Sequence, residues 1–271
     1  MSRIVKSIEL STGVTLQYFE QGSAEGIPMI LLHGMGDSWR SFERVLQFLP
    51  EDYLVIALTQ RGHGDSSKPE KGYCYSDFAT DLAAFMDARS IGSAVVVGHS
   101  MGSSNAKRFA LDYPKRTLGL VLIGSFADAS NTPGDRELWD TVISKMEDRL
   151  DQDFLRELQE DVIAGEIPQQ FFDTIVQESL KVPARVWKAV VLRDLEEDLS
   201  VEQGKIKAPV HIVWGDQDIT APRSDQDLQL RTIPNSKLLI YEGAGHSLHW
   251  EKPERFAADL ISFIETVRAD Q

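Results

Sequence analysis

The sequence predicts an α/β fold in which a mostly parallel sheet is flanked by helices and carries an all-helical insertion. Two observations predict the sheet: short, nearly continuous apolar runs recur along the chain, and helical patterns separate them. Such runs are typical of strands buried on both faces, and their alternation with helices indicates parallel βαβ units. The third observation is that strand patterns stop between residues 126 and 205, where amphipathic helical patterns replace them.

The first half of the chain is expected to contain a hairpin and four buried strands. Apolar positions alternate in 4–10 and 14–18 around the turn Ser11-Thr12-Gly13, which is typical of a β-hairpin. The buried strands are expected at 29–32, 54–58, 94–97 and 118–123. Apolar residues at helical spacing predict a helix before Gly92: Phe78, Leu82, Phe85 and Met86.

The insertion is expected to form four helices. Their apolar faces are Leu138, Val142, Met146 and Leu150; Phe154, Leu158 and Val162; Phe171, Phe172, Ile175 and Val176 after Pro168; and Val186, Trp187, Val190 and Leu195. Two further strands are predicted at 210–214 and 238–241, before a last helix around 256–264. We therefore expect a core domain of residues 1–125 and 206–271, interrupted by a helical insertion at 126–205.

Composition and charge exclude several classes of protein. The 271 residues carry a formal net charge of −14, which disfavours nucleic acid and anionic membranes as partners. The longest apolar runs, such as 54–58, are about five residues long, whereas a membrane-spanning helix needs about eighteen. Residues 1–6 lack the apolar core of a signal peptide, and the single cysteine, Cys74, fits a reducing compartment. We expect a cytoplasmic protein with a small-molecule substrate and no stable membrane association.

A serine lies in a glycine-flanked turn after a predicted buried strand. Gly98-His99-Ser100-Met101-Gly102 follows the run 94–97 and precedes a helical pattern, so Gly-x-Ser-x-Gly stands between strand and helix. The glycines allow a sharp turn from which the serine oxygen projects. The helix N-terminus supplies backbone donors and partial positive charge for a developing oxyanion. This context predicts Ser100 as a nucleophile.

Five motifs occur in an order that is typical of one superfamily. They are Leu31-Leu32-His33-Gly34-Met35-Gly36, Arg61-Gly62-His63-Gly64-Asp65-Ser66, the serine turn, Trp214-Gly215-Asp216-Gln217-Asp218, and Gly245-His246. Over residues 14–125 and 206–268 the chain resembles the α/β-hydrolase superfamily, in its lidded esterase, lactonase and C–C hydrolase group. The resemblance implies the α/β-hydrolase fold, a Ser…Asp…His order of catalytic residues and a lid (cap) at 126–205.

Two positions depart from the family pattern. Ser103 stands where glycine is common after the serine turn, which puts in doubt how closely the following helix packs on the sheet. Thr59 replaces the aspartate usual before the Arg-Gly-x-Gly turn. Neither residue belongs to the predicted triad.

The serine needs a base, and the resemblance implies His246. His249, three residues later, is the competing candidate but is expected to enter the following helix. The resemblance makes His33 and His63 supports of their turns. His99 is expected to point away from the nucleophile, and His211 to be a core residue of its strand.

The base in turn needs a carboxylate. Asp216 and Asp218 follow the same strand, and the resemblance favours the second of the pair, with Pro222 shortly after it. Asp216 is the alternative, although its ordinary role is that of a turn former. Asp128, after an earlier strand, is a further alternative that some family members suggest.

The oxyanion is expected to bind the backbone N–H groups of Met35 and Met101. No cofactor and no metal are expected, because the sequence contains no His-Glu-x-x-His, complete dinucleotide fingerprint or P-loop. Serine at the nucleophile position also disfavours epoxide hydrolases and haloalkane dehalogenases, which resemble this family but attack through a carboxylate.

The sequence therefore predicts a serine hydrolase of the carboxylesterase or lactonase type, which cleaves a small, mainly neutral apolar substrate through an acyl-enzyme on Ser100. Two alternatives are a C–C hydrolase of dienone-type substrates and a triad-bearing small-ligand sensor with slow turnover. Fast multiple turnover on ordinary esters would argue against the sensor.

The lid carries both aromatic side chains and most of the negative charge. Trp139, Phe171, Phe172 and Trp187 are candidates for the substrate pocket, although at helical spacing they also fit a lid core. Residues 126–205 contain 19 acidic and 9 basic side chains, a net charge of −10. These charges are expected on solvated helix faces, and they would disfavour anionic substrates.

Overall fold

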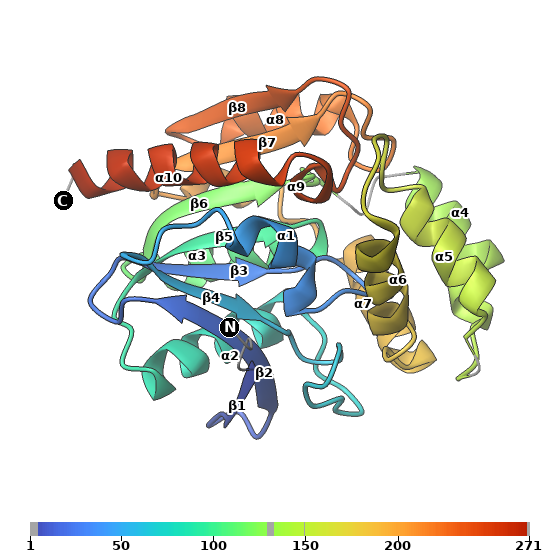
Figure 1. Ribbon diagram of the computed structural model, residues 1–271. Helices are drawn as coiled ribbons and strands as arrows, with labels where there is room; N and C mark the ends of the chain where they lie inside the picture. Colours follow the sequence, from blue (N-terminus) through green and yellow to red (C-terminus); the bar gives the residue numbers. More distant parts are fainter. Residues whose placement is uncertain (1–4, 129–132, 149, 270–271) are drawn as a thin grey trace.

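The computed structural model describes residues 5–128, 133–148 and 150–269 (Figure 1). Its eight-stranded sheet has the order β1-β2-β4-β3-β5-β6-β7-β8. The strands are β1 (Val5–Glu9), β2 (Thr15–Gly22), β3 (Pro28–Leu32), β4 (Leu54–Leu58), β5 (Ala94–His99), β6 (Thr117–Ile123), β7 (Val210–Gly215) and β8 (Ser236–Tyr241). β1 pairs antiparallel with β2, β2 pairs antiparallel with β4, and the other neighbours are parallel. The predicted fold class is confirmed; Ile4 lies outside the described residues.

Helices cover both faces of the sheet because successive strand residues point to opposite sides. In β3, Ile30 and Leu32 join the apolar cluster of α2 (Tyr75–Ala88) and α3 (Met101–Asp112). Leu31, between them, joins the cluster of α1 (Glu43–Leu46) and α10 (Pro253–Ala269) on the other face. The remaining core helices are η1 (Trp39–Phe42), α8 (Arg223–Thr232) and α9 (Leu248–Glu251).

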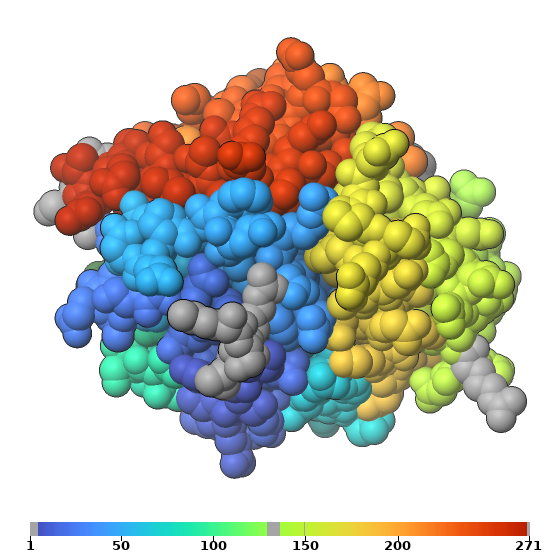
Figure 2. All heavy atoms as spheres, in the orientation of Figure 1, coloured from blue at the N-terminus to red at the C-terminus, as the bar shows by residue number. Residues whose placement is uncertain are grey.

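Between β6 and β7, all of the described secondary structure is helical. It contains α4 (Pro133–Thr141), η3 (Ile143–Lys145), α5 (Gln152–Glu160), α6 (Gln169–Ser179), α7 (Ala184–Glu196) and η4 (Gln203–Lys205). Figure 2 shows α5 to α7, coloured yellow-green to gold, as one end of the molecule against the blue N-terminal residues. We call α4 to α7 and their connections the lid.

One predicted lid helix is shorter than expected. The apolar spacing from Leu138 to Leu150 predicts one helix, but α4 ends at Thr141 and Val142 has φ −125° and ψ −66°. Three β-branched residues in succession, 141–143, disfavour the helix at this point. Ile143 is instead completely buried in the lid core. The prediction of a continuous helix was wrong because a local pattern does not show where tertiary contacts bend the chain.

The parallel strands bring five loops together beneath the lid. Residues after β3, β5, β6, β7 and β8 line one pocket with lid side chains, because parallel strands all end at the same edge of the sheet. In the described part of the chain, no helix is long and apolar enough to cross a membrane.

Candidate active site

Ser100 occupies a strained turn between β5 and α3. Its φ of 51° and ψ of −117° lie in a region that side-chain-bearing residues rarely adopt. The flanking glycines are required sterically: a Cβ on Gly98 would lie 2.3 Å from the Gly102 oxygen, and one on Gly102 would lie 2.3 Å from the Leu32 oxygen. The chain therefore holds Ser100 at the carboxyl edge of the sheet, where it lines the pocket.

The two departures from the family pattern are accommodated in the structure. Ser103 is completely buried, and its hydroxyl donates a hydrogen bond to the backbone carbonyl oxygen of Ser100 at 2.6 Å. Thr59 is also buried, and its hydroxyl oxygen accepts from the Trp39 amide at 3.2 Å. Both side chains thus stabilise loops next to the site.

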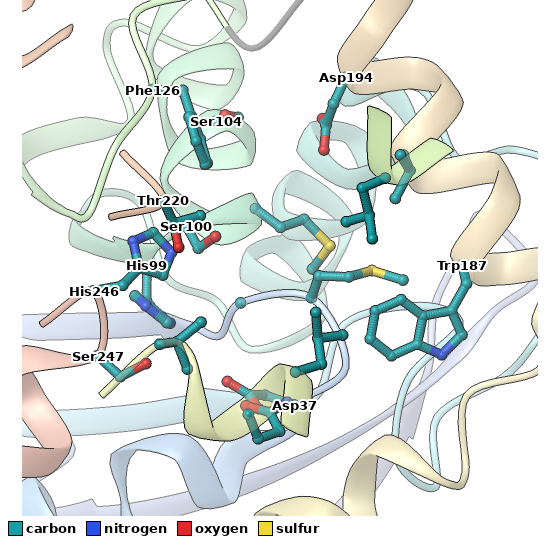
Figure 3. A pocket seen from close by; sticks show the side chains of 18 of the residues that line it. Asp37, His99, Ser100, Ser104, Phe126, Trp187, Asp194, Thr220, His246 and Ser247 are labelled. Carbon is teal, nitrogen blue, oxygen red and sulfur yellow. The ribbon is translucent and has the colours of Figure 1, made fainter. Parts of the chain in front are cut away.

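His246 lines the same pocket as Ser100 and forms a buried pair with Asp218 behind it. The distance between His246 Nδ1 and Asp218 Oδ2 is 2.8 Å, with side chains 3% and 0% exposed. Asp218 Oδ1 accepts from the Thr220 and Ala221 amides, each at 2.8 Å. Because the carboxylate is held at both oxygens, it selects the tautomer with the proton on Nδ1 and leaves Nε2 to accept one. Figure 3 shows Ser100, His99 and His246 grouped at one side of the pocket.

The competing candidates have other partners. Asp216 is exposed and accepts from the Gly243 amide at 2.7 Å, as a loop former does. Asp128 lies near Asp225, whereas the carboxylate bonded to His246 is that of Asp218. His249, in α9, contacts Ser41 Oγ through Nε2 at 3.2 Å, and burial lowers its pKa to about 3.

Two backbone amides in the pocket are available to an oxyanion. Met101 begins α3 and Met35 follows β3, and both residues line the pocket. Within the described ranges, neither amide donates a hydrogen bond to another group of the protein. Unused donors of this kind at a helix N-terminus suit a developing negative charge.

The remaining histidines have structural roles, and for His99 the predicted orientation is corrected. His33 contacts the Gly34 oxygen at 2.7 Å through Nδ1, and its Nε2 accepts from the Gln60 amide. His63 Nδ1 lies 2.9 Å from the Arg61 oxygen, and the half-buried His211 packs against a phenylalanine of α10. The expectation that His99 points away from the site was wrong.

His99 packs directly behind the catalytic candidate. Its ring centroid lies 5.0 Å from that of His246 and 4.6 Å from that of His249. Burial is the main cause that lowers the pKa of His99 well below its usual value. The ring is therefore a neutral packing surface for His246, not a second charge.

The pocket is mainly apolar and is lined by residues of both the core and the lid. Its lining residues are Gly34, Met35, Asp37, His99, Ser100, Met101, Ser104, Phe126, Leu138, Ile143, Leu158, Gln159, Val162, Trp187, Val191, Asp194, Thr220, His246, Ser247 and Trp250. An apolar cavity with a few polar groups at its wall is the usual form of a small-molecule site.

Of the four lid aromatics predicted to line the pocket, Trp187 does so and the others do not. Phe171 packs edge-on against Trp250, at 5.8 Å between ring centroids, in a separate cluster. Phe172 is buried beneath the Arg156 guanidinium, and Trp139 belongs to the lid core. The expectation for Trp139, Phe171 and Phe172 was therefore wrong, because periodicity identifies an apolar face but not what it packs against.

Several polar pocket residues were not anticipated from the sequence. Asp194, on α7, accepts from the Tyr75 hydroxyl at 2.8 Å and pairs with the buried Arg193 at 2.6 Å. Asp37 follows Met35 by two residues, and its place after a buried strand is a signal that could have identified it. A carboxylate in an amphipathic helix, such as Asp194, offers no such signal.

Another unanticipated residue supports the pocket from behind. The buried Lys107 of α3 donates to the carbonyl of Phe126, which lines the pocket. Burial lowers the pKa of Lys107 to about 8. Among the described residues, no group of three or more histidine, cysteine or acidic side chains could hold a metal ion.

Comparison with known proteins identifies the family to which this chain belongs. The family model for the alpha/beta hydrolase fold matches residues 27–172. The chain belongs to the α/β-hydrolase fold family. This hydrolase is 28% identical to a 2-(acetamidomethylene)succinate hydrolase of Mesorhizobium japonicum, over 93% of its own chain and 92% of the relative.

Two further comparisons show the range of relatives. A non-heme chloroperoxidase of Streptomyces lividans is 26% identical, over 96% of this chain and 99% of that protein. The solved structure of an esterase, RhEst1, from Rhodococcus sp. superposes with a TM-score of 0.84 and 25% identity, covering 97% of this hydrolase and 99% of the esterase. These relatives share the fold along nearly the whole chain and differ in the reactions for which they are named.

Proposed function

We propose that this hydrolase cleaves a carboxylic ester or lactone through an acyl-enzyme on Ser100. The observation that carries the proposal is the 2.8 Å contact of His246 Nδ1 with Asp218 Oδ2 in the pocket that Ser100 lines. A histidine held in this tautomer can take the serine proton, which makes the hydroxyl a competent nucleophile. The similarity to the Rhodococcus esterase RhEst1 supports the same class of reaction.

The reaction then proceeds in two steps, acylation and deacylation of Ser100. Ser100 Oγ attacks the carbonyl carbon while His246 Nε2 takes its proton, and the Met35 and Met101 amides bind the oxyanion. His246 returns the proton to the leaving alkoxide, so an alcohol departs and the acyl group stays on Ser100. Water, deprotonated by His246, attacks the acyl-enzyme and releases the acid and free Ser100.

The pocket walls favour a small neutral substrate. Apolar side chains of core and lid face the cavity, among them Met35, Met101 and Leu158. The Asp194 carboxylate also lines it and lies across the pocket from Ser100 in Figure 3. Because this carboxylate is already paired with Arg193, and the described lining contains no lysine or arginine, a carboxylate-bearing substrate would find no cationic side chain to compensate its charge.

The test combines covalent labelling with kinetics. A fluorophosphonate should label Ser100, as located by mass spectrometry, and Ser100→Ala should lower kcat on 4-nitrophenyl esters by about six orders of magnitude. Ser104→Ala, in the same pocket, is the matched control and should still be labelled at Ser100. Equal ester hydrolysis by Ser100→Ala and the unmodified protein would refute the proposal. A single turnover followed by arrest would favour the sensor alternative.

A further inference from the structure

Asp37 is a buried carboxyl group in the pocket, and one of its oxygens has no partner among the described residues. Asp37 is only 2% exposed, and it lines the pocket from the same loop as Met35. Oδ2 accepts from the Ser41 hydroxyl at 3.1 Å. Oδ1 is buried and has no hydrogen-bond partner in the described part of the chain. In Figure 3, Asp37 lies at the edge of the pocket opposite Phe126 and Asp194.

The neighbours of Ser41 determine where the proton of Asp37 resides. Trp250 Nε1 can only donate, and it does so to Ser41 Oγ at 3.0 Å. His249 Nε2 also contacts Ser41 Oγ, and His249 Nδ1 has no hydrogen-bond partner among the residues that the structure describes. If Nε2 carries the histidine proton, Nδ1 is left as an unpaired acceptor; the other tautomer would bury an unpaired N–H, which proteins avoid more strictly.

In this arrangement the Ser41 hydroxyl accepts two hydrogen bonds and donates one to Asp37 Oδ2. A proton on the Asp37 carboxyl group must then lie on Oδ1, the buried oxygen for which the described residues provide no partner. Within the described residues, no lysine or arginine forms an ion pair with Asp37, so only the Ser41 hydrogen bond favours the ionised form. Burial, together with the nearby Glu178 carboxylate, raises the pKa of Asp37 well above its usual value. A neutral carboxyl group in an apolar pocket is a hydrogen-bond donor without an acceptor.

We infer that Asp37 Oδ1 donates a hydrogen bond to the substrate, which therefore carries an oxygen acceptor, such as a ketone or ether, in addition to the reacting carbonyl. This inference rests on the proposed function, since it specifies the substrate of the same pocket. Other lining residues also carry buried polar atoms without a partner in the described chain, among them Trp187 Nε1, Ser247 Oγ and the ring nitrogens of His99, which agrees with a substrate that has more than one polar group. A site built to bind a polar group rejects the analogue that lacks it, because its own group is then left unpaired.

The test measures binding, so it does not depend on turnover. In a Ser100→Ala background, ethyl 4-oxopentanoate, 5-oxohexanoate and 6-oxoheptanoate are each compared with the ethyl alkanoate of equal chain length, by calorimetry or by quenching of Trp187 and Trp250 fluorescence. We expect at least one keto ester to bind about tenfold more tightly than its alkyl partner, as one buried hydrogen bond allows.

Variants of Asp37 then assign the preference. Asp37→Asn should keep it, because the amide oxygen can accept from Ser41 while the amide N–H takes the place of the protonated Oδ1. Asp37→Leu and the smaller Asp37→Ala should abolish it, whereas Asp194→Asn, across the pocket, should retain it. The inference is overturned if no keto ester binds more tightly than its partner, if the preference survives in Asp37→Leu and Asp37→Ala, or if Asp37→Asn removes it. Fluorophosphonate labelling of the unmodified protein tests the proposed function separately.

Discussion

The Glu251 carboxylate accepts a hydrogen bond from the Gly245 amide at 2.9 Å, directly before His246 in the chain. The same carboxylate accepts from two lid amides, those of Ala164 at 3.2 Å and Gly165 at 2.8 Å. The Ser247 amide adds a bond to the Val162 oxygen at 2.9 Å. One acidic side chain of α9 therefore ties the histidine loop to the lid.

Replacing this carboxylate should loosen both segments. In Glu251→Gln only one oxygen remains, and the new amide N–H faces a backbone donor, so we expect the free energy of unfolding to fall by about 2–3 kcal/mol. We also expect kcat to fall on every ester, because His246 is less well held. Urea unfolding and steady-state kinetics measure the two effects. Glu242→Gln, an exposed residue of the same loop, is the control and should change neither.

Asp218→Asn tests the assignment of the carboxylate. The amide oxygen must accept from the Thr220 and Ala221 amides, so the amide N–H₂ faces His246 and forces the proton onto Nε2. His246 then cannot take the serine proton, and kcat should drop by about 10⁴. Asp216→Asn should change kcat less than about threefold, because that side chain is exposed. The reverse ranking of the two variants would assign the role to Asp216.

Gly102→Ala distinguishes steric need from helix propensity. Propensity alone predicts that alanine stabilises α3 by about 1 kcal/mol. The structure predicts the opposite, because the added Cβ would lie 2.3 Å from the Leu32 oxygen and 2.6 Å from the His33 oxygen. We expect a loss of about 2 kcal/mol or more by urea unfolding. A Cβ at Gly92 meets nothing within 4 Å, so Gly92→Ala should be neutral; equal effects at both positions would contradict the close approach.

Trp187 and Phe172 separate pocket lining from lid core. Both side chains are buried in the lid, but only Trp187 lines the pocket. Trp187→Leu enlarges the cavity, so we expect the ratio of kcat/KM for long-chain over short-chain 4-nitrophenyl esters to rise about tenfold. Phe172→Leu should lower stability and leave that ratio unchanged. A similar change of ratio in both variants would argue against the pocket boundary.

The buried histidines predict loss of stability in acid. Burial is the main cause that lowers the pKa of His63 from 6.5 to about 4, with smaller contributions from Arg193 and Lys68. Between these values the unfolded chain binds a proton that the folded chain does not, so the free energy of unfolding falls as pH falls from about 6.5 to about 4. His63 alone should contribute about 3 kcal/mol to this loss.

His63→Gln should remove that contribution while its amide can still donate to the Arg61 oxygen. The measurement is urea unfolding at pH 4.5 and 7.5. Over this range the free energy of unfolding of the variant should change less, because unfolding takes up about one proton fewer. His211→Gln is the control, since His211 is only half-buried. An unchanged pH dependence in His63→Gln would show that its ring is protonated in the folded protein.

The expected fold and the motif positions were predictable because both depend on local sequence. Buried parallel strands read as apolar runs, and the turn at Ser100 requires Gly98 and Gly102 whatever the rest of the chain does. Since parallel strands end at one edge of the sheet, the order of the motifs also predicts that Ser100 and His246 lie together. The two line one pocket.

The lid shows where local information ends. Its apolar spacing predicts helices, yet it does not indicate that α4 stops at Thr141 or that Trp187 faces the pocket while Phe171 packs on Trp250. An amphipathic face can be satisfied by several partners of similar hydrophobicity. Which partner it meets is decided by the packing of the whole lid on the core.

The sequence by itself therefore determined the sheet, the serine turn and three candidate carboxylates for the histidine, among which the family resemblance favoured Asp218 over Asp216 and Asp128. The tertiary structure shows that Asp218 meets His246, 28 residues away, and it alone decided that Asp37 and Glu251 are buried against the site. The reason is physical: hydrophobic period and turn chemistry act over a few residues, whereas a hydrogen bond is specified by the relative positions of segments that only the folded core brings together.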